Sequence, residues 1–169
     1  MLKRILMTAA LAGILPANAM AADVSTGGTV GKLVNVTLVD EGHEGPDLSK
    51  NMGLGMAMGG DASKAVMSIK TDVFAVPAGL VTFKATNASN HMVHEMLLAP
   101  ISSMSKPLPY NDADNRVDEE AAGDIGEVAE LEPGKSGSLT VELKPGLYIL
   151  LCNIPGHYAA GMWKVIAVQ

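Results

Sequence analysis

The chain has 169 residues, which is enough for one domain with a substantial core. Eighteen acidic residues outnumber twelve basic ones, giving a net charge of −6. This balance disfavours nucleic acid as a partner, because phosphate binding needs clustered Lys and Arg, and it suits a cationic partner better.

Residues 1–22 have the layout of a secretory signal peptide. Lys3 and Arg4 precede an uncharged, mostly apolar run, and alanines at 17, 19 and 21 give cleavage spacing. The run is too short and too interrupted to predict a stable membrane span, although a signal anchor stays an alternative. Cleavage would remove two basic residues and leave a net charge of about −8. We expect a mature, monomeric domain over residues 23–169 in a bacterial periplasm, not an integral membrane protein.

Short apolar–polar alternations separated by Gly and Pro turns predict an all-β protein. Residues 32–40 alternate, with Val34, Val36 and Leu38 on one face, and residues 65–76, 80–87 and 91–100 are further strand regions. Residues 126–152 hold three more strand candidates, separated by "PGKSG" and "KPG", and residues 162–168 hold the last. A total of about seven or eight short strands favours a Greek-key β-sandwich.

Two segments interrupt the strand pattern, and we expect both to be long loops on the sandwich. Residues 41–61 are rich in Gly and carry Met52, Met56 and Met58. Residues 101–126 are strongly acidic and include a candidate short helix. An acidic run of this kind is more often a solvated face than a docking site.

The only cysteine, Cys152, lies at the end of one predicted strand. A single cysteine cannot form an internal disulfide, so it is an inert buried thiol, an intermolecular partner, a nucleophile or a metal ligand. His157 and Met162 follow at equal intervals, and Met162 begins the next strand. If these two strands are antiparallel neighbours, the three side chains converge at one end of the sandwich. Thiolate, imidazole and thioether together suit copper, which alternates between soft Cu(I) and borderline Cu(II).

A second imidazole would come from the strand region that begins at residue 91. His94 has the same strand parity as Met96 and Leu98, whereas His91 has the opposite parity. If the Met96 face points inward, His94 is the buried ligand and His91 is a surface residue, and the reverse assignment stays open. The remaining histidine, His43, lies in a charged loop. The candidate metal ligands, which match the ligand set of a blue copper site, are therefore His94, Cys152, His157 and Met162.

These motifs resemble the cupredoxins, the type 1 copper proteins of the plastocyanin/azurin kind. The tail "CNIPGHYAAGM" is similar to the ligand loop of azurin in its Pro-Gly-His and to that of plastocyanin in its ending, and "VTFKATNASNHMVHEMLL" is similar to the first ligand strand of small bacterial members. The resemblance covers residues 65–169 well and residues 23–64 only as a first strand. It implies one type 1 copper ion, Cu(I)/Cu(II), and electron exchange with a redox partner protein such as a c-type cytochrome.

One residue departs from the family's pattern. In plastocyanin and azurin the residue after this histidine is typically Asn, whose side chain helps to tie the two ligand loops together, and here it is Glu95. The resemblance therefore leaves that cross-loop hydrogen bond open and makes Glu95 a candidate outward-facing charge. Pro155 would stiffen the ligand loop and Gly156 would let it turn, and if His157 reaches the surface it is the natural electron exit.

The function expected from these features is one-electron transport by an exported mononuclear copper protein that is not an enzyme. The ligand set leaves no vacant position for a substrate, and the chain lacks a His-x-His motif for a second catalytic copper centre. The alternative is a periplasmic copper carrier or resistance protein, in which Met52, Met56 and Met58 would add soft ligands for Cu(I). Irregular packing is the plainer interpretation of that methionine cluster.

Overall fold

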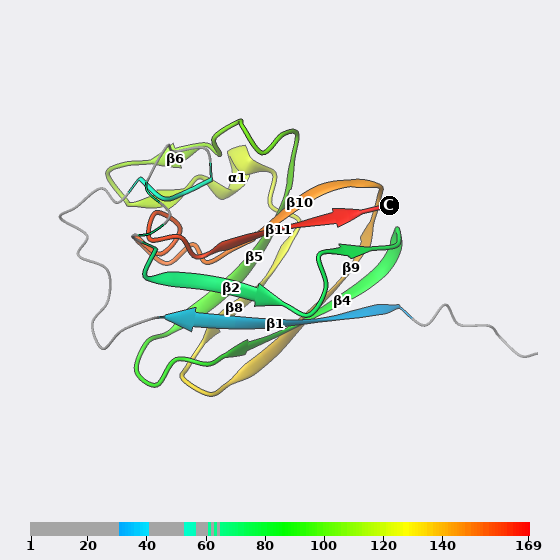
Figure 1. Ribbon diagram of the computed structural model, residues 1–169, viewed down its shortest axis with the longest axis horizontal. Helices are drawn as coiled ribbons and strands as arrows, with labels where there is room; N and C mark the ends of the chain where they lie inside the picture. Colours follow the sequence, from blue (N-terminus) through cyan, green and yellow to red (C-terminus); the bar gives the residue numbers. More distant parts are fainter. Residues whose placement is uncertain (1–30, 41–52, 57–60, 62, 64) are drawn as a thin grey trace, which may run out of the picture.

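Two β-sheets pack face to face in the computed structural model (Figure 1), which describes residues 31–40, 53–56, 61, 63 and 65–169. Over these residues the elements in chain order are β1 (Lys32–Asp40), β2 (Met67–Thr71), β3 (Ala75–Val76), β4 (Gly79–Asn87), β5 (His94–Ile101), β6 (Tyr110–Asn111), β7 (Arg116–Val117), α1 (Glu119–Ala122), β8 (Gly126–Leu131), β9 (Ser136–Leu143), β10 (Gly146–Leu151) and β11 (Trp163–Val168). The first sheet has the order β2-β1-β4-β9 and the second β3-β11-β10-β5-β8, while β6 and β7 pair separately. The predicted all-β sandwich is confirmed, with eight of its strands five residues or longer.

Strand β1 illustrates how the sequence sets the two faces of a sheet. It pairs antiparallel with β2 and parallel with β4. Val34, Val36 and Leu38 are buried, while Asn35 is exposed and Thr37 is only partly covered. Because side chains alternate along a strand, this pattern directs the apolar residues towards the second sheet, as predicted.

The main core fills the space between the two sheets. Each apolar side chain that is fully buried there contributes about 1.5–3 kcal/mol relative to an exposed one. The largest fully buried side chains of this main core come from both sheets and include Leu38, Phe83, Met96, Leu150, Met162 and Ile166. The cysteine Cys152 belongs to the same cluster, so the predicted ligand loop starts inside the core.

A second core lies on the other face of β5 and β10. Leu97, Ala99, Ile149 and Leu151 point away from the first sheet and are fully buried, which explains why both strands read as nearly continuous apolar runs. Residues of the predicted loop segments cover them, including Met56 and Val117. The acidic segment 101–126 therefore forms β6, β7 and the predicted short helix, and it packs on the sheet.

Helix α1 has a cap at each end. The side chain of Asp118 accepts a hydrogen bond from the Ala121 N–H at 3.0 Å at the N-terminus. Gly123 ends the helix in a left-handed conformation with φ 73°, which favours glycine.

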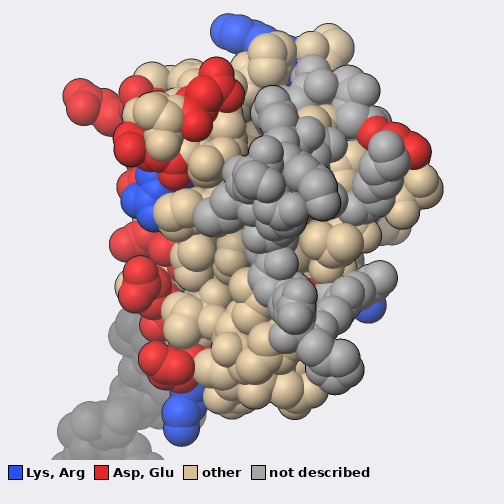
Figure 2. Space-filling model, turned by 90° about the vertical axis from the view of Figure 1, so that its left-hand side faces the viewer, with Lys and Arg blue, Asp and Glu red and all other residues tan. Residues whose placement is uncertain are grey.

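The acidic residues are unevenly spread over the surface. Asp and Glu side chains gather along one edge of the face that Figure 2 shows.

Several sequence predictions concern residues outside the described part of the chain. These are the signal peptide over residues 1–22, His43, and the methionines Met52 and Met58. In the part that the structure describes, no helix has the length and apolarity needed to cross a membrane.

Candidate metal centre

The predicted ligand loop connects two antiparallel neighbours, β10 and β11. Its base is closed by backbone hydrogen bonds: the Cys152 N–H donates to the Met162 carbonyl at 3.1 Å, and the Met162 N–H donates to the His157 carbonyl at 3.0 Å. Gly156 has φ 85°, a conformation that other residues rarely adopt, so the turn before His157 depends on this glycine. The base of the ligand loop is thus held by backbone hydrogen bonds and does not depend on a bound metal ion.

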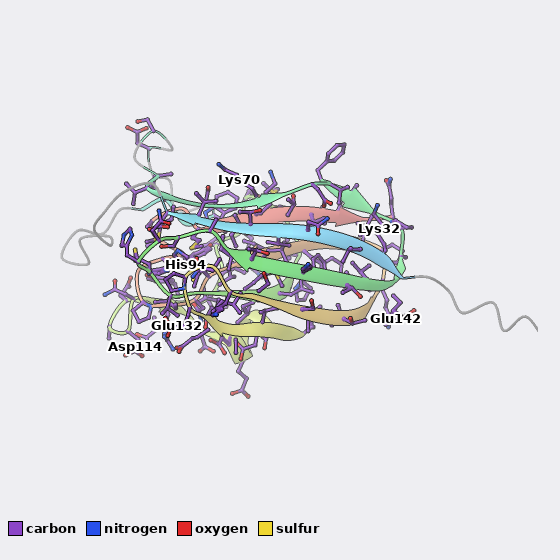
Figure 3. The ribbon with its side chains drawn as sticks, turned by 90° about the horizontal axis from the view of Figure 1, so that it is seen from below. Lys32, Lys70, His94, Asp114, Glu132 and Glu142 are labelled. Carbon is purple, nitrogen blue, oxygen red and sulfur yellow. The ribbon has the colours of Figure 1, made fainter. Side chains whose placement is uncertain are left out.

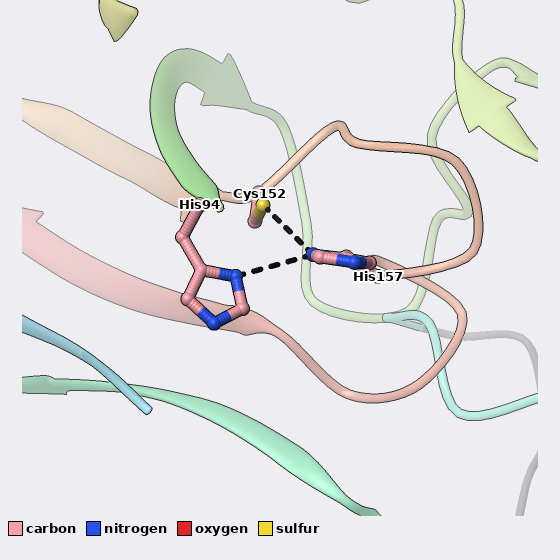
Figure 4. A group of neighbouring side chains, drawn as sticks. All are labelled: His94, Cys152 and His157. Atoms are coloured by element: carbon pink, nitrogen blue, oxygen red, sulfur yellow. Dashed lines mark hydrogen bonds between the residues drawn. The ribbon is translucent and has the colours of Figure 1, made fainter. Parts of the chain in front are cut away.

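Three of the four predicted ligands converge at one end of the sandwich. His94, the first residue of β5, lies at the end opposite Glu142 (Figure 3). Its Nδ1 is 3.2 Å from the Nδ1 of His157, which is 3.3 Å from the Sγ of Cys152 (Figure 4). One donor atom from each of these residues lies within 4.8 Å of the others, and all three side chains are buried. Met162 is fully buried where the loop rejoins the sheet.

The spacing of these donor atoms fits a first-row metal ion. Nitrogen atoms 3.2 Å apart subtend about 105° at an ion that is about 2.0 Å from each, by the distances found in zinc sites. The 3.3 Å separation of sulfur and nitrogen corresponds to about 100° for a metal–sulfur distance of about 2.3 Å. Both angles are near tetrahedral, and a thiolate with two imidazoles is a donor set that suits copper.

Burial sets the protonation of the metal-free site. It raises the pKa of the Cys152 thiol to about 12. It also lowers the pKa of His157 to about 4, with a smaller contribution from His94, and lowers the pKa of His94. The metal-free site therefore holds a neutral thiol and neutral imidazoles near pH 7, and a metal ion must displace the thiol proton to bind.

The structure distinguishes His94 from His91, the two histidines that the sequence offered as the second imidazole ligand. His94 is fully buried and belongs to the converging group. The side chain of His91 is 35% exposed, and its Nε2 lies 3.3 Å from the Oδ2 of Asp40. The pairing of β5 with β8 shifts register between His94 and Met96, an irregularity often found beside functional sites.

Glu95 links the two ligand segments. Its backbone N–H points at the Cys152 sulfur at 3.4 Å. Burial, with a smaller effect of Glu127, raises the pKa of the Glu95 carboxyl to about 7. Glu95 is therefore partly buried, and its backbone ties the two ligand segments together.

Asn153, which the sequence reasoning missed, anchors the ligand loop to the acidic segment. It is fully buried. Its Oδ1 accepts from the Val117 N–H at 2.7 Å, and its Nδ2 donates to the Val117 carbonyl at 2.9 Å and to Glu119 Oε1 at 2.8 Å. The available signal was an amide side chain directly after the cysteine, at the end of an apolar strand.

The ligand loop is covered rather than exposed. The Leu54 N–H donates to the Ala159 carbonyl at 3.1 Å, and the Trp163 indole donates to the Leu54 carbonyl at 3.0 Å. His157 itself is only 3% exposed, so the condition set for it as an electron exit at the surface is not met in this structure. Met56, the one described member of the methionine cluster, is 1% exposed in the second core.

Comparisons with known proteins agree with this geometry. The model of the copper-binding proteins of the plastocyanin/azurin family matches residues 55–169. A search of curated protein sequences gave no match.

Among solved structures, reduced rusticyanin is similar with a TM-score of 0.51 and 20% identity, over 81% of this chain and 78% of that chain. Rusticyanin from Thiobacillus ferrooxidans has a TM-score of 0.51 and 19% identity, over 81% and 76%. At these identities the likeness concerns the fold alone. Reduced auracyanin from the photosynthetic bacterium Roseiflexus castenholzii has 24% identity over 59% of this chain and 86% of that chain, but its TM-score of 0.43 is too low to support an argument.

Proposed function

The chain belongs to the plastocyanin/azurin family of copper-binding proteins, and on that premise we propose that it is a mononuclear type 1 copper protein that carries single electrons between redox partners. The observation that carries the proposal is the convergence of the buried donor atoms of His94, Cys152 and His157. Met162 completes the proposed ligand set as the weak axial thioether, which tunes the metal more than it holds it.

The copper ion supplies a one-electron couple, and the protein residues supply a fixed, dry environment for it. The two imidazoles and the thiolate suit both oxidation states. The backbone bonds at the base of the loop and the contact of the Glu95 N–H with the Cys152 sulfur hold the donors before a metal arrives. Since the donors are already placed, a change of oxidation state requires little movement of the chain, and burial keeps water away from the ion.

Electron transport fits this ligand set better than catalysis at the metal. Two imidazoles, a thiolate and a thioether leave no position for a substrate. The chain has two other histidines, His43 and His91, which are too few for a second catalytic copper centre. We therefore propose that the protein is not an enzyme.

We propose that the redox partner is a cationic protein, such as a c-type cytochrome. Nine of the eighteen acidic residues lie between 112 and 132, where Arg116 is the single basic residue. Glu119, one of these nine acidic residues, accepts a hydrogen bond from the side chain of Asn153, which follows Cys152 directly. A cationic partner attracted to this segment would therefore lie close to the ligand loop.

Export to a periplasm and removal of residues 1–22 complete the proposal and rest on the sequence pattern. Mass spectrometry of protein recovered from a periplasmic extract checks both points. A chain that keeps Lys3 and Arg4 and stays with the membrane would contradict them.

The visible spectrum of the copper-loaded protein tests the proposed site. Cys152 should give the intense blue colour that a cysteine thiolate produces with Cu(II) in this geometry. Cys152→Ser is the matched control, because it replaces sulfur by oxygen at the same position and should abolish the colour. A colourless or pale wild type would contradict the proposal.

The cationic partner is tested separately, by stopped-flow reduction of the copper-loaded protein by a c-type cytochrome. A rate of reduction that falls as the salt concentration rises would support this partner.

A further inference from the structure

Asp40, the last residue of β1, places a carboxylate between two histidines. Its side chain is only 6% exposed. The Oδ2 atom lies 3.3 Å from the Nε2 of His91, and the Oδ1 atom lies 3.6 Å from the Nε2 of His94. A carboxylate this enclosed needs polar partners, and these two imidazoles face it.

The two ring nitrogens of His94 face different groups. Nδ1 faces the metal centre, 3.2 Å from His157 Nδ1. Nε2 is buried and has no hydrogen bond to any residue that the structure describes, while Asp40 lies just beyond hydrogen-bond distance. A ring that offers Nδ1 to a metal must carry its proton on Nε2, and a small rotation would bring that proton to the Asp40 oxygen.

We propose that Asp40 is a positioning residue for His94. Its carboxylate accepts the Nε2–H, which fixes the tautomer that leaves Nδ1 free for the metal. This inference rests on the ligand set proposed above. Carboxylate–histidine–metal arrangements orient the ring and raise its basicity as a ligand.

The charge of Asp40 has a second consequence for the same site. The oxidised ion carries one positive charge more than the reduced ion, and a buried carboxylate stabilises the more positive state more strongly. Reduction adds one electron at the metal and needs no bond to Asp40 to form or break. Asp40 therefore favours the oxidised form and lowers the reduction potential.

Two substitutions separate the hydrogen bond from the charge. Asp40→Asn keeps an oxygen acceptor of the same shape and removes the charge, whereas Asp40→Ala removes both. The matched control is Glu142→Gln, which removes one acidic charge from an exposed position at the other end of the sandwich (Figure 3). The measurements are the reduction potential and, by competition, the affinities for Cu(II) and Cu(I).

We expect Asp40→Asn to lower the Cu(II)/Cu(I) affinity ratio about tenfold, which corresponds to a rise of about 59 mV for one electron. Asp40→Ala should in addition weaken Cu(II) binding by about ten- to a hundredfold. Glu142→Gln should leave the potential unchanged. Imidazole nitrogen NMR of the metal-free wild type should find His94 protonated on Nε2, with His157 donating its Nδ1–H to His94 Nδ1.

The outcomes distinguish failure of this inference from failure of the proposed function. A blue wild type whose Asp40→Asn and Asp40→Ala variants keep its potential overturns the inference and leaves the function standing. A wild-type His94 ring protonated on Nδ1 and not on Nε2 overturns it even if neither variant folds. A wild type that takes up no copper overturns both.

Discussion

Asn153→Ala should destabilise the protein far more than an ordinary loss of an asparagine side chain. The substitution removes the partners of the Val117 N–H and carbonyl, which lie at 2.7 and 2.9 Å from the amide. Val117 is 1% exposed, so water cannot replace the lost bonds. Each buried group left without a partner costs about 1–3 kcal/mol, so we expect a loss of about 3–4 kcal/mol. Glu119, the third partner, is partly exposed and adds little.

Urea unfolding of the metal-free protein measures this loss. Asn111→Ala is the matched control, because Asn111 is exposed in the same segment and its side-chain hydrogen bonds lie at the surface. The control should lose less than about 1 kcal/mol. The blue colour should survive in Asn153→Ala, since no donor atom is removed. A loss below about 1 kcal/mol in Asn153→Ala would refute the reasoning, because it would mean that the Val117 groups find other partners.

Three further predictions concern the ligands and their neighbours. His94→Ala should abolish the blue site and His91→Ala should leave the spectrum intact, and the reverse result would contradict the ligand assignment. Met162→Leu should keep copper and raise the reduction potential, and an unchanged potential would exclude an axial role for the thioether. In the metal-free protein, the His157 pKa of about 4 lies below the ordinary 6.5, so the free energy of unfolding falls as pH falls through that window. The Glu95 contribution has the opposite sign, because its pKa is raised from 4.5 to about 7: it is present in full below pH 4.5 and is lost as pH rises through 7. Glu95→Gln should therefore lose stability more steeply than the wild type from pH 7 to 5 in urea titrations, and equal slopes would refute the assignment.

The sequence predicted those features that depend on local pattern. Alternation along β1 predicted which face of the strand is buried, because side-chain direction repeats every two residues. The spacing of Cys152, His157 and Met162 predicted a loop at one end of the sandwich, because a strand ends at the first and another begins at the last. Parity in β5 likewise predicted that His94 is buried. His91 is exposed as predicted, but it lies before the strand begins, so parity is not the reason.

The features that the sequence did not predict are contacts between distant parts of the chain. Asp40 meets His94 across 54 residues, and Asn153 meets Val117 across 36. These pairs depend on how the strands are ordered and on how the acidic segment folds back on β5 and β10, which periodicity does not encode. The role of Glu95 was missed for the same reason, since its backbone N–H meets the Cys152 sulfur of the other ligand segment, 57 residues along the chain.

The way the ligand loop is fastened favours an electron carrier over a protein that delivers copper. Delivery requires donor atoms that a recipient can approach one at a time, whereas His157 and Cys152 are at most 3% exposed beneath a covered loop. The described methionine of the cluster, Met56, packs in the second core, which argues against a soft-ligand site for a second ion. We therefore expect one tight Cu(I) per chain in a competition titration under reducing conditions. Changing Met52, Met56 and Met58 together to Leu should alter stability or partner electron-transfer rates and leave that stoichiometry unchanged. A second tight Cu(I) that disappears in this variant would instead make copper delivery the better explanation.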